Sequence, residues 1–80
     1  MIKENVIPLD NLSKGQTARV TELTASGNAR RRMLDLGLVI GTIVEALHIS
    51  PSGDPTAYHI RGAVIALRSE EAHKIFVELN

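Results

Sequence analysis

The sequence predicts a small, mainly β domain in which short strands close into a barrel and two helices flank them. Short runs of aliphatic and β-branched residues alternate with turns rich in glycine, proline, serine and asparagine. Hydrophobic residues make up 44% of the chain, but Tyr58 and Phe76 are the only aromatic ones, so aliphatic side chains must build the core. One internal segment has helical periodicity instead.

Five segments have the pattern of strands: residues 6–9, 16–24, 42–50, 56–61 and 63–68. Pro8 restricts the first to a sheet edge or a strand start, because proline cannot donate a backbone hydrogen bond. Leu23 breaks the alternation of the second, so we expect a bulge near Glu22. The third is mostly apolar on both faces, which predicts that much of it is covered on both sides.

The internal helix begins after Ser26 or Asn28, since either side chain can accept a hydrogen bond from a free amide of the first turn. An apolar stripe recurs at i, i+4 and i+7, formed by Ala29, Met33 and Leu36. Gly37 follows at once and suits the left-handed position that ends many helices. The helix is short, so we expect it to pack across an open end of the sheet.

A second helix is predicted at the C-terminus. Ser69 is its expected cap, and two glutamates follow in its first turn, where carboxylates are favourable. Its apolar side chains have helical spacing and form one stripe: Ala72, Ile75, Phe76 and Leu79. A meander of short strands must close on itself or cover its edges. An SH3-like β-barrel satisfies this, as a single domain over residues 1–80.

Composition excludes several classes of function. Nine basic and nine acidic side chains give a formal net charge of zero, which argues against long-range attraction of nucleic acid or of an anionic membrane. The absence of cysteine excludes disulfides, zinc–thiolate sites and cysteine nucleophiles. Lys3, Glu4 and Asp10 interrupt the apolar N-terminal segment, and no apolar run approaches the ~20 residues of a membrane span.

Catalysis is not expected either. The chain has no glycine-rich phosphate loop, no arguable Ser-His-acid arrangement and no paired carboxylates in a plausible cleft. Asp54 falls in a turn, and the serines fall in turns and helix caps. We therefore expect a protein that is not an enzyme and that needs no cofactor.

Several segments resemble the ferrous iron transport protein A (FeoA) family. They are Ala-Arg-Arg-Arg-Met-Leu-Asp-Leu-Gly-Leu at 29–38, Gly-Thr-Ile-Val-Glu-Ala-Leu at 41–47, Ser-Pro-Ser-Gly-Asp-Pro at 50–55, and Arg61-Gly62, Ala66-Leu67-Arg68 and Glu71-Ala72. The resemblance runs from about Leu12 to Val77 in the same order. One departure is Val39-Ile40 before Gly41, where the family often has proline.

This resemblance implies an SH3-like fold and an accessory role in ferrous iron transport. The partner that it implies is FeoB, a membrane permease for ferrous iron that carries a GTP-binding domain. The expected function is docking on the cytosolic side of that permease, which modulates transport or the GTPase cycle. The expected location is the cytoplasm, with recruitment to the inner face of the membrane by the partner rather than by direct insertion.

The candidate docking residues are the basic helix and its apolar neighbours: Arg30, Arg31, Arg32, Leu34 and Leu38. Arginine binds carboxylates through two parallel hydrogen bonds, so these side chains fit acidic groups on a partner. The alternative is a solvated helix face in which Asp35 pairs with Arg31. Three successive arginines cannot share one helix face.

Apolar residues of the same region have two interpretations as well. Either they form a patch for the permease or for a second copy of the chain, or they plug the barrel end. Plugging is favoured for Leu38 and Ile40, whereas Leu34 lies off the main apolar stripe and is expected to be exposed. Val39 belongs to the same apolar connection.

His48 and His59 are weak candidates for a metal site. If the hairpin loop comprises residues 52–55, the two side chains lie opposite each other, within ~5 Å at Cβ. Two histidines could bind a divalent metal weakly, with Asp54 or a partner as a further ligand. This gives the alternative function, a divalent-metal-responsive sensor module. A slip of one residue in register would separate the two side chains.

Overall fold

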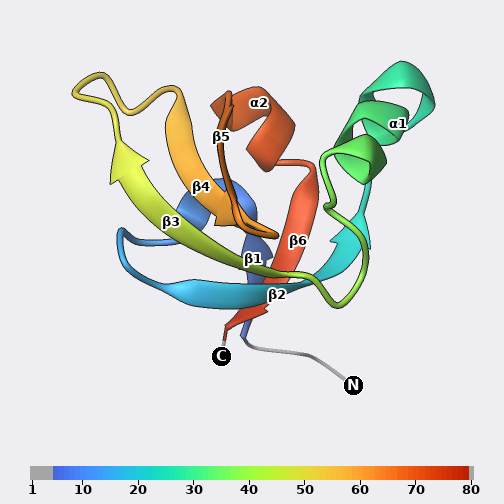
Figure 1. The fold of residues 1–80 in the computed structure, drawn as a ribbon, viewed down its shortest axis with the longest axis horizontal. Coiled ribbons are helices and arrows are strands. Elements are labelled where there is room, and N and C mark those ends of the chain that lie inside the picture. Colours follow the sequence, from blue (N-terminus) through green and yellow to red (C-terminus); the bar gives the residue numbers. More distant parts are fainter. Residues whose placement is uncertain (1–4, 80) are drawn as a thin grey trace.

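The computed structural model describes residues 5–79; Lys3 and Glu4, which interrupt the apolar N-terminal segment of the sequence, lie outside this range. Two helices and a 3-10 turn accompany the strands of this part of the chain (Figure 1). The elements are β1 (Val6–Pro8), η1 (Leu9–Asn11), β2 (Thr17–Leu23), α1 (Gly27–Asp35), β3 (Ile43–Ile49), β4 (Thr56–Ile60), β5 (Ala63–Leu67), α2 (Ser69–Ala72) and β6 (Ile75–Leu79).

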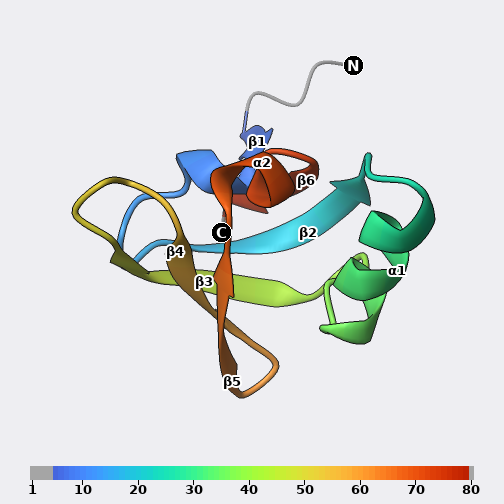
Figure 2. The same ribbon diagram turned by 90° about the horizontal axis from the view of Figure 1, so that it is seen from above.

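The strands form one antiparallel sheet with the order β1-β6-β2-β3-β4-β5. Figure 2 shows that β5 runs across the direction of β2 and β3, so the sheet is strongly twisted. The predicted fold class is confirmed, because the domain is mainly β with short helices. The ladder itself stays open, since β1 and β5 are its two edges and do not pair with each other.

The five predicted strands agree with β1 to β5 to within one or two residues. The register between β2 and β6 shifts between Val20 and Glu22, which confirms the bulge expected near Glu22. Pro8 ends β1, and β1 is an edge strand, as its proline required.

The predicted C-terminal helix is wrong beyond its first turn. α2 ends at Ala72, and Ile75–Leu79 forms strand β6, which lies between β1 and β2. Ile75 and Val77 are fully buried, so alternate residues of β6 supply the core. Ser69 is the first residue of α2 rather than its cap, a position that Arg68 occupies.

The core lies between the sheet and the elements that close its ends. Every strand except β1 contributes a fully buried or nearly buried side chain, and so do η1, α1 and α2. β3 is less covered than predicted: Val44 and Ala46 are buried, but Ile43 is 49% exposed and Ile49 is 42% exposed.

η1 and α2 lie against each other at one side of the sheet. The imidazole Nδ1 of His73, just after α2, lies 3.3 Å from the Asp10 carboxylate in η1. The Tyr58 hydroxyl donates a hydrogen bond to the Leu9 carbonyl at 3.4 Å. The first contact joins η1 to the end of α2, and the second joins η1 to β4.

Candidate docking surface and family

Helix α1 stands beyond the end of β2, to one side of the sheet (Figures 1 and 2). Met33 is its one buried residue. Ala29, which the sequence placed on the buried stripe, is exposed, and Leu36 is half-buried. The helix is therefore anchored mainly through Met33, and most of its surface faces solvent.

The three arginines of α1 have three different environments. Arg30 Nη1 donates a hydrogen bond to the Leu23 carbonyl at 3.0 Å, which ties the helix to the end of β2. Arg32 forms an ion pair with Glu71 of α2. Arg31 is exposed, and within residues 5–79 its side chain has no hydrogen bond or ion pair, so the pairing with Asp35 that the alternative interpretation required is absent.

Gly37 ends α1 with a φ of +94°, a conformation that glycine adopts without steric cost. The Leu38 amide donates to the Met33 carbonyl and the Gly37 amide donates to the Leu34 carbonyl, both at 3.0 Å. This is the Schellman pattern, in which the residue after the glycine makes an apolar contact. Leu38 makes that contact and is fully buried.

Burial of Leu38 removes it from the candidate docking residues and confirms that it plugs the end of the sheet. Leu34 is 40% exposed, as predicted. Ile40 is 71% exposed, so the expectation that it plugs the barrel end is wrong. Because the Schellman turn directs Leu38 inward, Val39 and Ile40 emerge on the surface; Val39 is 38% exposed.

We define the α1 surface as Arg31, Leu34, Val39 and Ile40. Arg31 and Leu34 are three positions apart on the helix and therefore neighbours on its surface. The loop that carries Val39 and Ile40 is held at both ends. The Thr42 hydroxyl donates to the Gly37 carbonyl at 2.9 Å, and the Gly41 amide donates to the Val20 carbonyl at 2.7 Å. The surface thus combines an unpaired guanidinium with exposed aliphatic side chains on a fixed backbone.

The predicted pairing of the two histidines is wrong. In the β3–β4 ladder His59 lies opposite Glu45 and His48 lies opposite Ala57. A shift in register between Ala46 and His48 causes this, together with a hairpin loop longer than the four residues assumed. Both side chains are exposed. Among the described residues no group of three or more histidine or carboxylate side chains could hold a metal ion.

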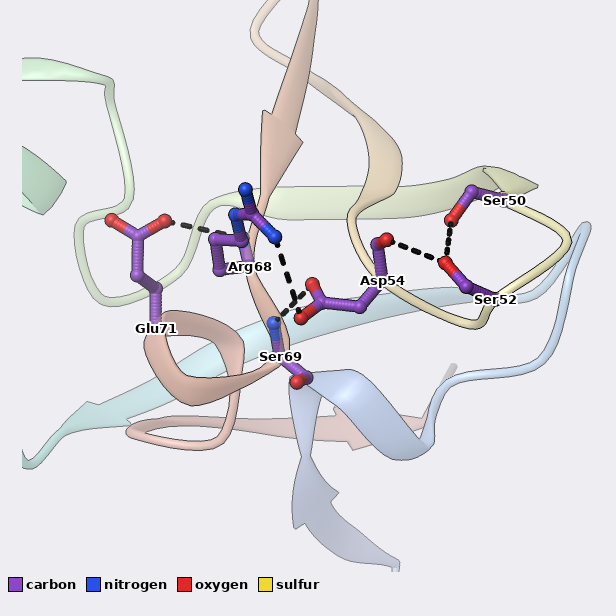
Figure 3. Close-up of polar contacts among 6 residues, drawn as sticks. All are labelled: Ser50, Ser52, Asp54, Arg68, Ser69 and Glu71. Atoms are coloured by element: carbon purple, nitrogen blue, oxygen red, sulfur yellow. Dashed lines mark hydrogen bonds and ion pairs between the residues drawn. The ribbon is translucent and has the colours of Figure 1, made fainter.

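The Ser50–Pro55 turn packs against α2 through Asp54 (Figure 3). Asp54 Oδ1 accepts a hydrogen bond from the Ser69 amide at 2.9 Å, and its Oδ2 lies 3.9 Å from Arg68 Nη1. The Ser52 hydroxyl donates to the Asp54 carbonyl at 2.9 Å. Asp54 thus shapes a turn, as its sequence context predicted, and it also binds the first amide of α2, which the sequence did not predict.

The FeoA domain model matches residues 7–79, almost the whole described part of the chain. The chain belongs to the FeoA domain family. The motifs at 29–38, 41–47 and 50–55 fall inside this match, so the resemblance seen in the sequence is confirmed.

A curated relative is the Fe(2+) transport protein A/Fe(2+) transporter FeoB fusion protein of Porphyromonas gingivalis, 35% identical over 71 residues. The match covers 89% of this chain and 8% of that protein, so the chain spans only a small part of its length. As its name states, that protein combines an Fe(2+) transport protein A segment and an iron transporter in one polypeptide.

Solved structures of the family have the same fold. The FeoA-like protein of Clostridium acetobutylicum is 33% identical, with a TM-score of 0.87 over 99% of this chain and 90% of that one. FeoA of Stenotrophomonas maltophilia, a prokaryotic SH3 domain protein solved in complex with zinc, is 30% identical, with a TM-score of 0.75 over 88% of this chain and 87% of that one. The SH3-like fold is therefore confirmed.

No helix within residues 5–79 is long and apolar enough to cross a membrane.

Proposed function

We propose that this chain is a non-catalytic accessory protein of ferrous iron uptake. It docks on the cytosolic side of a FeoB-type permease and modulates transport or the GTPase cycle of that permease. The observation that carries the proposal is the Porphyromonas gingivalis protein, which joins a segment similar to 89% of this chain to a ferrous iron transporter. Fusion raises the effective concentration of one domain for the other, which is useful when the two bind each other.

The α1 surface is the part of the chain that fits this docking best. Arg31 is the one arginine of the helix whose side chain binds nothing within residues 5–79, since Arg30 and Arg32 bind Leu23 and Glu71. A free guanidinium can bind a carboxylate of the permease through two hydrogen bonds. Leu34 lies three positions along the helix from it, and Ile40 lies in the loop after α1; both add exposed apolar area. Arginine is enriched among the residues that dominate binding energy at interfaces.

The test is a titration of the isotope-labelled 80-residue chain with the soluble cytosolic part of its FeoB-type permease, followed by NMR. Under the proposal, amide shifts cluster on α1 and the 37–41 loop. Arg31→Glu leaves the melting temperature unchanged and weakens binding about tenfold, because it replaces an attraction by a repulsion. A large loss of melting temperature would instead make Arg31 structural.

Lys14→Glu is the matched control, because it makes the same change of charge at an exposed residue before β2, whereas α1 follows the other end of that strand. Equal weakening by both variants would contradict docking through α1, since binding would then depend only on overall charge. Sedimentation of the chain alone separates this partner from a second copy seated on the same surface.

A divalent-metal-responsive module is the second function that we consider. The zinc complex of Stenotrophomonas maltophilia FeoA favours it. The register of β3 and β4 does not, because His48 and His59 are not cross-strand partners. Anaerobic titration with Fe(II) decides: this function requires the imidazole signals of His48 or His59 to move well below about 1 mM metal.

A further inference from the structure

The outer edge of β5 is unpaired in the described chain. β5 ends the sheet order, and no backbone hydrogen bond other than those of the β4 ladder joins residues 63–67 to the rest of residues 5–79. Figure 2 shows the strand extending away from the rest of the sheet toward the β4–β5 turn. A free edge of this kind is a template for another strand.

The hairpin geometry identifies the free backbone groups. β4 and β5 are joined by Arg61 and Gly62, whose φ values of 50° and 85° match the two-residue type I′ turn. The residues that flank such a turn, Ile60 and Ala63, exchange hydrogen bonds with each other. Because bonded and non-bonded pairs alternate along an antiparallel ladder, Val64 and Ala66 direct their amides and carbonyls outward.

The two edges of the sheet differ in protection. β1 has three residues and ends at Pro8, which has no amide to donate, so this edge is short and blocked. β5 has five residues, Ala-Val-Ile-Ala-Leu, without charge, proline or a shift in register. Its Val64 side chain is 66% exposed. An edge without any of the usual protective features suits pairing with a strand of another polypeptide.

Charge argues against a second copy as the occupant. An antiparallel pair of β5 strands centred on Ile65 would bring Arg61 of one copy beside Arg68 of the other at both ends. The Arg68 Nη1 atom lies 3.9 Å from the Asp54 carboxylate, and the Arg68 side chain is 64% exposed. Its guanidinium is therefore accessible to a partner. Like charges brought together in this way are destabilising.

We propose that the β5 edge binds an extended segment of a partner protein by strand addition. The segment has apolar side chains at alternate positions and aspartate or glutamate at its ends. Its backbone pairs with Val64 and Ala66, while its acidic ends lie beside Arg61 and Arg68. This edge shares no residue with the α1 surface, although the Arg61 side chain packs against Gly37 at the end of α1. Shifts at Val64 and Ala66, and not those at Gly37, therefore distinguish strand addition from docking through α1.

The test uses the isotope-labelled 80-residue chain and a nine-residue peptide with Val-Thr-Val-Thr-Val between two glutamates at each end. We expect the largest amide shifts at Val64 and Ala66, and slower hydrogen exchange of both amides. A peptide with lysines in place of the glutamates should bind at least about tenfold more weakly.

Val64→Pro removes the outward amide and leaves the β4 ladder intact, since proline is tolerated on an edge strand when its nitrogen faces solvent. It should weaken peptide binding at least about tenfold. Should this variant fail to fold, Val64→Glu keeps the backbone amide and should weaken binding of the glutamate peptide, because it brings like charges together at the same edge. Ile49→Lys is the control, because it removes an exposed aliphatic side chain from β3, and it should bind like the original chain.

Three results would overturn the proposal. They are no shifts with the glutamate peptide up to about 1 mM, shifts confined to residues outside β4 and β5, and concentration-dependent dimerisation that protects Val64 and Ala66 without peptide. The last of these would assign the edge to a second copy.

Discussion

Tyr58 is the largest of the fully buried side chains, and its hydroxyl donates to the Leu9 carbonyl. Burial raises the pKa of Tyr58 from 10.0 to about 12. A raised pKa means that folding favours the protonated phenol, so this contribution to stability is complete below pH 10 and is lost as the pH rises toward 12. We expect the free energy of unfolding to fall by on the order of 2 kcal/mol over that range.

Tyr58→Phe is the comparison that isolates this effect. All other titratable groups are the same in the two proteins, so the difference between the two pH profiles belongs to Tyr58. Urea unfolding at a series of pH values measures it. Parallel profiles would mean that the phenol ionises in the folded state without cost.

Gly37 and Gly15 make a matched pair for the cost of a side chain at positive φ, which is +94° and +86°. A Cβ at Gly37 would lie 2.4 Å from Arg61 Cδ, whereas none of the atoms around Gly15 lies within 4 Å. We expect Gly15→Ala to cost about 1 kcal/mol from backbone strain and Gly37→Ala to cost about 1 kcal/mol more, because the Arg61 stem must move. Equal losses in urea unfolding would show that this stem moves freely.

Single residues also mark the limit of prediction for the candidate site. The sequence predicted that Arg30, Arg31 and Arg32 point in different directions, because helical geometry requires it. Which of them stays free depends on Glu71, which lies 39 positions after Arg32 and reaches it only through the packing of α2. The exposure of Ile40 likewise follows from the Schellman turn, which buries Leu38 instead.

At the scale of elements, α2 depends on a residue outside itself. Its first amide, that of Ser69, is bound by Asp54 from the β3–β4 loop (Figure 3). We expect Asp54→Ala to lower stability by about 1 kcal/mol, as for other lost helix caps, and to speed hydrogen exchange of the Ser69 amide. Asp54→Asn should cost less, because it keeps an acceptor and loses only the charge near Arg68.

Glu70→Ala is the control for the loss of a negative charge near the start of α2. The Glu70 side chain makes no hydrogen bond or ion pair within the described range, so this variant should melt close to the original temperature. If Glu70→Ala cost as much as Asp54→Ala, the effect would be one of charge near the helix start and not of capping.

Residues 75–79 explain why one element was predicted wrongly. Ala72, Ile75, Phe76 and Leu79 have helical spacing, while Ile75, Val77 and Leu79 alternate as in a strand, so a short segment satisfies both periods. Only the space between β1 and β2, which is set by distant parts of the chain, selects the strand. The longer strands with clear turn signals between them carried no such ambiguity.

The register of β3 and β4 could not be predicted from the sequence, for a similar reason. A bulge changes which residues face each other without leaving a composition signal in a strand that is mostly apolar on both faces. The bulge in β2 was visible because Leu23 breaks a clear alternation, whereas the irregularity between Ala46 and His48 lies among apolar residues on both faces. For this reason the sequence could not decide whether His48 and His59 face each other across the hairpin.

The whole molecule has a small core, and its last strand is central to it. For 80 residues the total stability is on the order of 4–12 kcal/mol, so one buried side chain matters. Val77 of β6 is fully buried and lies opposite Ile7 of β1 and Val20 of β2, whereas Val64 is 66% exposed. We expect Val77→Ala to cost about 2 kcal/mol and Val64→Ala less than about 0.5 kcal/mol in urea unfolding. Similar losses would mean that Val64 is covered in solution, and a small loss for Val77 would contradict the central place of β6.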